Sequence, residues 1–78
     1  MPRPSAVDPS LAVALRAMRT EAGLSQEDLA HEANLTTAAL SRSERGKTNP
    51  SWTTLQSILA ALKADLADLQ ARIERTRS

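Results

Sequence analysis

The residues with the most specific chemistry lie between positions 24 and 51 of the chain. Arg42, Arg45 and Lys47 place three positive charges within six residues. The fork of N–H donors on Arg42 suits the O6 and N7 acceptors of a guanine base. Acidic residues gather separately, at Glu27, Asp28 and Glu32, so the cations lie on their own part of the chain. This pattern permits nucleic-acid binding without requiring it.

Two short helices joined by a tight turn must position these residues. The segments that predict them, read in order, are Leu24-Ser25-Gln26-Glu27-Asp28-Leu29-Ala30, Leu35-Thr36, Leu40-Ser41-Arg42, Glu44-Arg45-Gly46 and Asn49-Pro50-Ser51. Their caps, apolar positions and turn residues predict two helices, a loop and the start of another helix. Such an arrangement presents one helix to the major groove of DNA.

Composition limits the chain to one small helical domain. The 78 residues allow a single core, and the 41% of apolar residues are mostly Ala and Leu, with Trp52 the only aromatic residue. There is no cysteine, no apolar stretch near the roughly 20 residues that span a bilayer, and no secretory signal at the first residues. We therefore expect a soluble cytoplasmic protein without membrane contact. The net charge of +1 is low for a nucleic-acid binder, which is usually basic.

Apolar spacing and capping residues predict an all-α protein of five helices, over about 8–22, 25–33, 36–45, 51–62 and 65–76. We expect a single domain over 8–78 and a flexible N-terminal arm over 1–7. The expected N-terminal caps are Asp8, Ser25, Thr36, Ser51 and Asp65. Gly23, Asn34 and Gly46 should supply the left-handed residue with which a helix ends, and Lys63 should lie in the last break.

These motifs resemble the lambda-repressor/Cro-like helix-turn-helix family, also called the XRE family, over about residues 11–70. The matching elements are Arg19, Gly23, the run from Leu24 to Ala30, Leu40-Ser41-Arg42, Glu44-Arg45-Gly46, Pro50-Ser51 and Thr54-Leu55. The family usually has Gly where Asn34 stands, and Ile, Leu or Trp where Ser43 stands. If position 43 is buried, Ser loses about 1.5–3 kcal/mol of apolar burial. We expect either a less tightly held third helix or a neighbour such as Trp52 filling the gap.

The resemblance implies how DNA would be contacted. The base-reading residues would be Thr37, Ala38, Ser41 and Arg42 on the outward side of the third helix. The phosphate-contacting residues would be Ser25 and Gln26 at the start of the second helix, together with Arg45, Lys47, Thr48 and Asn49. Because this recognition helix has few strong donors, DNA shape could add to specificity.

Three further residues are expected to be structural. The resemblance implies that Arg19 and Glu44 form a partly buried ion pair between the first and third helices. Trp52 is expected to fill the core rather than to lie exposed at a subunit interface. His31 is expected to be a solvated histidine, because no second ligand lies at metal spacing. We find no nucleophile beside a base, so the sequence predicts no enzyme, no metal and no cofactor.

The function implied by the resemblance is a sequence-specific transcriptional regulator that binds duplex DNA as a homodimer on a palindromic operator. The dimer interface is expected at Leu62, Leu66, Leu69 and Ile73. The short chain looks like a restriction-modification controller protein or a phage-type repressor, with no effector domain. The alternatives are an antitoxin that binds a toxin protein and autoregulates its operon, and a helical domain that has lost DNA binding.

Overall fold

The computed structural model describes residues 9–77, so the expected arm over 1–7 and the Asp8 cap lie outside the described residues. The described part is all-α, as predicted. Its helices are α1 (Pro9–Glu21), α2 (Gln26–Glu32), α3 (Thr37–Glu44), α4 (Trp52–Ala61) and α5 (Leu66–Arg77). Each end lies one residue from the expected one; Ser25, Thr36 and Ser51, for example, cap their helices from just outside.

Hydroxyl and carboxylate caps begin four of the helices. The Ser25 hydroxyl accepts the N–H of Asp28 at 3.0 Å, and the Asp28 carboxylate accepts the N–H of Ser25 at 3.3 Å. These two hydrogen bonds satisfy two of the backbone N–H groups that have no partner at the start of a helix. Thr36 and Ser51 cap α3 and α4, and Asp65 and Asp68 form a second reciprocal pair at the start of α5.

Left-handed residues end the first four helices. They are Gly23, Asn34, Gly46 and Lys63, with φ between 57° and 76°. Gly adopts this conformation without strain, and Asn tolerates it better than most side chains. Lys63 has neither advantage, so the turn from α4 to α5 is the most strained of the four. Asn34 has the same left-handed backbone as Gly23 and Gly46, so it ends α2 as the Gly usual at this position in the family would.

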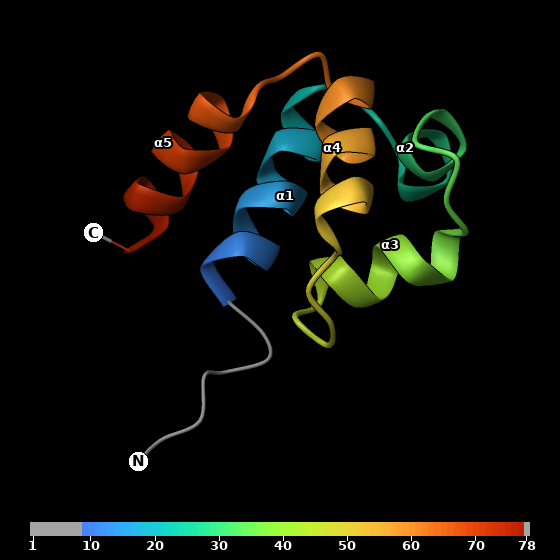
Figure 1. The fold of residues 1–78 in the computed structure, drawn as a ribbon, viewed down its shortest axis with the longest axis horizontal. Helices are drawn as coiled ribbons and strands as arrows, with labels where there is room; N and C mark the ends of the chain where they lie inside the picture. Colours follow the sequence, from blue (N-terminus) through green and yellow to red (C-terminus); the bar gives the residue numbers. More distant parts are fainter. Residues whose placement is uncertain (1–8, 78) are drawn as a thin grey trace.

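Every helix contributes one large, fully buried side chain to the core. These are Leu15, Leu29, Leu40, Ile58 and Leu69. The helix α5 packs along α1, α3 packs against α1 and α2, and α4 packs against α2 (Figure 1). At about 1.5–3 kcal/mol for each buried aliphatic side chain, this layer holds the two helices of the helix-turn-helix on the other three.

Two expectations about apolar side chains are wrong. Trp52 is 56% exposed rather than buried in the core. It lies on the same side of α4 as Gln56 and Ala60, which are also exposed and are spaced four residues apart along the helix. Leu69 is only 1% exposed, so it packs inside the monomer and cannot contact a second subunit. Ser43 is buried, at 6% exposure.

No helix in the described part of the chain is long and apolar enough to cross a membrane.

Candidate nucleic-acid interface

The helix α3 has one buried side and one exposed side. Leu40, Ser43 and Glu44 are buried against the domain. Thr37, Ala38 and Arg42 are exposed, and Ser41 is half-buried at the edge of the same side. The four predicted base-reading residues therefore lie together on the outer surface of one short helix.

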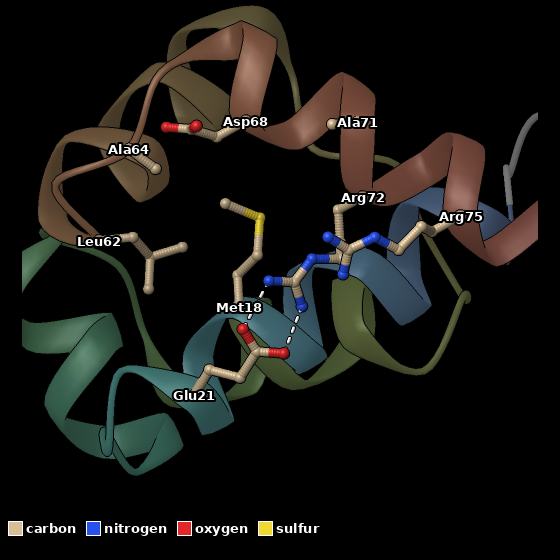
Figure 2. A pocket seen from close by; sticks show the side chains of 8 residues that line it. All are labelled: Met18, Glu21, Leu62, Ala64, Asp68, Ala71, Arg72 and Arg75. Carbon is tan, nitrogen blue, oxygen red and sulfur yellow. Dashed lines mark hydrogen bonds and ion pairs between the residues drawn. The ribbon is translucent and has the colours of Figure 1, made fainter.

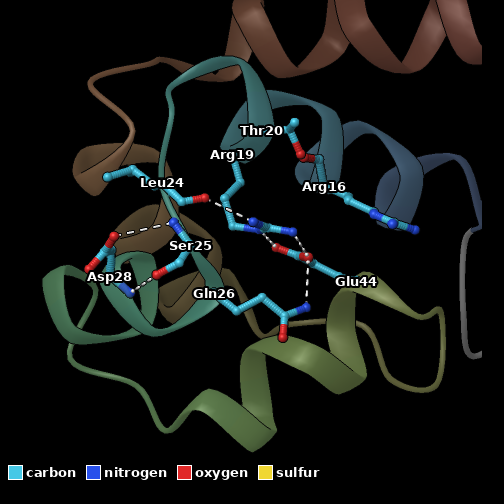
Figure 3. A network of polar contacts seen from close by, with 8 residues as sticks. All are labelled: Arg16, Arg19, Thr20, Leu24, Ser25, Gln26, Asp28 and Glu44. Carbon is cyan, nitrogen blue, oxygen red and sulfur yellow. Dashed lines mark hydrogen bonds and ion pairs between the residues drawn. The ribbon is translucent and has the colours of Figure 1, made fainter.

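A polar network fixes the orientation of α3 (Figure 3). Arg19 of α1 donates from Nε and Nη2 to the two carboxylate oxygens of Glu44, at 2.8 and 3.0 Å. Its Nη1 also donates to the carbonyl of Leu24 at 2.8 Å, in the turn before α2. The Glu44 side chain is only 1% exposed. The expected ion pair is thus present, and one arginine ties α1 to both helices of the helix-turn-helix.

Gln26 belongs to the same network, which the sequence did not predict. Its amide Nε2 donates to Glu44 Oε1 at 3.1 Å, so the side chain bridges the start of α2 to α3. A glutamine amide carries two N–H donors, and this hydrogen bond uses one. Gln26 is half-buried, and its position is set by Glu44.

The predicted phosphate-contacting cations are exposed beside α3. Arg45 follows α3 directly and Lys47 lies in the loop after it. Within residues 9–77, no described ion pair involves either of them or Arg42. Thr48 and Asn49 are exposed in the same loop. The Ser25 hydroxyl is instead occupied as the cap of α2.

Arg16 is not among the residues that the sequence predicts to contact DNA. This residue is exposed on α1, and it lines the same open pocket as Arg19, Gln26, Ser41, Glu44 and Arg45. A signal was available in the sequence, because Arg16 and Arg19 are three residues apart and therefore lie on neighbouring positions of one helix.

The clearest pKa shifts lie away from this interface, between α1 and α5. The Arg72 guanidinium forms two hydrogen bonds to the Glu21 carboxylate (Figure 2), which hold the pKa of Glu21 below its usual value of 4.5. Attraction by the charges of Arg72 and Arg75 adds to this effect, while partial desolvation opposes it. The same contact raises the pKa of Arg72. This pair joins α5 to α1 and does not touch α3.

Among residues 9–77, no three His, Asp or Glu side chains cluster closely enough to hold a metal ion. His31 is exposed on α2, as expected of a solvated histidine.

The five helices and the exposed side of α3 define a lambda-repressor-like helix-turn-helix domain. The family model described as "Helix-turn-helix domain" matches residues 10–75. The chain therefore belongs to the helix-turn-helix domain family. Domains of this class bind DNA by placing a helix in the major groove.

Known proteins similar to this chain are regulators. The HTH-type transcriptional regulator DdrOP3 of Deinococcus deserti is 42% identical over 60 residues, which cover 77% of this chain and 46% of that protein. The chain thus spans about half the length of this relative.

Among solved structures, the clp gene regulator ClgR from C. glutamicum has a TM-score of 0.83 and 30% identity, with 90% of this chain and 91% of that chain covered. The restriction-modification controller protein C.AhdI from Aeromonas hydrophila has a TM-score of 0.74 and 33% identity, with 77% and 91% covered. The wild-type controller protein C.Esp1396I has a TM-score of 0.83 and 25% identity, with 88% and 91% covered.

Proposed function

We propose that this protein is a sequence-specific DNA-binding transcriptional regulator that acts by occupying its operator. The observation that carries this proposal is the outer side of α3, where Arg42 stands exposed between Ala38 and Arg45 while the opposite side is buried. An exposed helix with a free guanidinium can enter the major groove and bind a guanine. Thr37 and Ser41 add single hydroxyls, and Ala38 can contact a thymine methyl group.

Phosphate contacts would set the register of the protein on the duplex. The candidates are Lys47, Thr48 and Asn49 in the loop after α3, Arg45 directly at the end of α3, and Ser25 and Gln26 at the start of α2. Ser25 would contribute through its backbone, since its hydroxyl caps α2. Gln26 has one N–H that is not used by Glu44. Because duplex DNA is the partner, we propose that the protein acts in the cytoplasm.

The regulator acts as a homodimer in this proposal, since one short α3 reads too few bases for tight specific binding. The contact surface that we propose keeps Leu66 of the four residues expected from the sequence and adds Trp52. Leu62 and Ile73 pack against the core and Leu69 lies inside it. Trp52 and Leu66 are 56% and 48% exposed and line a hollow of about 440 Å³ between α4 and the start of α5.

A second copy of the chain is the occupant proposed for this hollow. Trp52 and Leu66 line the same hollow, and contiguous exposed apolar surface is typical of protein interaction sites. To bind a palindromic site, a two-fold dimer must set its two α3 helices roughly 34 Å apart, the spacing of successive major grooves.

The subclass most consistent with the known structures is a restriction-modification controller protein, with a phage-type repressor as the other candidate. The similarity to C.AhdI and C.Esp1396I favours the former. Nothing in the comparisons supports the alternative of a toxin partner.

The role of α3 is tested by selecting duplexes from a random pool with the wild-type protein and measuring binding of the selected site by Arg42→Ala. Loss of a bidentate contact to guanine should cost about 1–3 kcal/mol and relax selection at one position. A variant that selects the same site with the same affinity would refute base reading by Arg42.

A further inference from the structure

We infer that the pocket between α1, α2 and α3 seats a phosphate of the DNA backbone, with Arg16 as the contact from α1. The pocket is an open hollow of about 250 Å³ lined by Arg16, Arg19, Gln26, Ser41, Glu44 and Arg45. This inference rests on the proposed function and extends it to a helix outside the helix-turn-helix.

The net charge of the residues that line this pocket is positive, because the ion pair between Arg19 and Glu44 is neutral and two arginines remain. Arg19 and Glu44 neutralise each other, and both carboxylate oxygens of Glu44 already accept hydrogen bonds from Arg19 or Gln26. The Glu44 side chain is also shielded, at 1% exposure. The remaining charges belong to Arg16 and Arg45, so an anion that enters the pocket meets two guanidinium groups and no accessible carboxylate.

Both of these arginines are available to a ligand. They are exposed, and neither takes part in an ion pair within the described residues. A guanidinium binds phosphate oxygens through two parallel hydrogen bonds. Figure 3 shows Arg16 on α1 close to Arg19, the residue that holds the Glu44 carboxylate.

The position of the pocket identifies the phosphate as one of the DNA backbone. Ser41 of α3 and Arg45, directly after α3, line it, and Arg42, the proposed base reader, lies between them in the sequence. A helix in the major groove has a sugar-phosphate backbone along each side, because the groove is only about 12 Å wide. Gln26 and Arg16 would therefore meet the backbone on the α1 and α2 side, opposite the loop that carries Lys47.

The test compares Arg16→Ala with Arg75→Ala, a matched variant that removes the same charge from the exposed surface of α5. Both are measured by fluorescence anisotropy on a duplex selected by the wild-type protein, over a series of salt concentrations. Because Ala is a good helix former, neither change should unfold its helix, and circular dichroism checks this.

Arg16→Ala should weaken binding by about tenfold at low salt. The variant should also make the slope of log K against log salt shallower by about 0.9 for each phosphate contact that is lost. Arg75→Ala should keep the wild-type slope, and Arg16→Lys should restore most of it because the charge returns. Equal slopes for Arg16→Ala and the wild type, or equal losses for Arg16→Ala and Arg75→Ala, would overturn the inference.

Inorganic phosphate at constant ionic strength distinguishes a free anion from the DNA backbone. Added phosphate should leave the affinity for the selected duplex unchanged. Phosphate binding that disappears in Arg16→Ala but is unaffected by bound DNA would show a separate site for free phosphate and would overturn the assignment to DNA. If the wild type binds no duplex even at low salt, both this inference and the proposed function fail; if only the Arg16 comparison fails, the proposed function stands.

Discussion

Arg19 and Glu44 stand 25 residues apart in the sequence and form a two-pronged ion pair, with N···O distances of 2.8 and 3.0 Å. The Arg19 side chain is 14% exposed and the Glu44 side chain 1% exposed. Removal of either partner leaves the other as a poorly solvated charge, which is more costly than loss of a surface pair.

The first prediction concerns this pair. Glu44→Ala should lower the free energy of unfolding by about 3–5 kcal/mol. Arg19→Ala with Glu44→Ala should cost clearly less than the sum of the two single changes. Urea denaturation of the four proteins gives the coupling energy. The exposed pair Glu21 and Arg72 is the control, with a smaller coupling; a coupling near zero for Arg19 and Glu44 would contradict the structure.

The second prediction separates stability from recognition at two neighbouring threonines. The Thr36 hydroxyl accepts the N–H of Ala39 at 3.0 Å as the cap of α3, so Thr36→Ala should lower stability by about 1 kcal/mol. Thr37 is the first residue of α3 and is exposed, so Thr37→Ala should leave stability nearly unchanged and reduce binding to a selected duplex. Thermal unfolding measures the stability of each variant, and fluorescence anisotropy measures its DNA binding. A loss of stability in Thr37→Ala with a loss of DNA binding alone in Thr36→Ala would contradict this assignment.

The third prediction is the pH dependence of the contact between α1 and α5. Because Arg72 lowers the pKa of Glu21 in the folded protein, the stability from this pair is present above the usual value of 4.5 and is lost as the pH falls through the lower folded value. The difference in stability between the wild type and Glu21→Gln should shrink as the solution is acidified. It should also shrink at high salt, since the pair is exposed.

Glu32→Gln is the matched control for this pH series. Glu32 is an exposed glutamate of α2 that takes part in no ion pair of residues 9–77. Denaturation from neutral to acid pH should show no comparable convergence for it. A constant difference between the wild type and Glu21→Gln at every pH would rule out the proposed contribution of the pair.

The fourth prediction concerns the dimer surface. Trp52→Glu and Leu66→Glu should each convert the dimer to a monomer in sedimentation equilibrium, because a charge would be buried in an apolar contact. Val13→Glu is the control, since Val13 is equally exposed, at 52%, on α1. A wild-type protein that remains monomeric at all concentrations, or a dimer that survives both glutamate changes, would refute this surface.

Local chemistry made the helix boundaries predictable. Ser25, Thr36 and Ser51 are caps whose hydrogen bonds reach only three residues along the chain, so the sequence contains both partners. The left-handed ends at Asn34 and Gly46 are equally local.

The two wrong predictions concern which side of a helix faces the core after the helices pack. Trp52 and Leu69 both occupy apolar positions of amphipathic helices, but spacing alone does not say how far each helix is rotated about its axis. The contact between Gln26 and Glu44 and the place of Arg16 in the pocket likewise depend on how three helices meet. These features needed the three-dimensional structure.

The most direct test of the account is the affinity of the wild-type protein for duplex DNA as a function of salt. If Arg16, Arg45 and Lys47 of each subunit of a dimer contact phosphates, log K should fall linearly with log salt with a slope of about −5. A selected duplex should also bind more tightly than a scrambled one at every salt concentration. Absence of binding at low salt, or binding with a slope near zero, would contradict the central claim that α3 and its flanking cations form a DNA-binding surface.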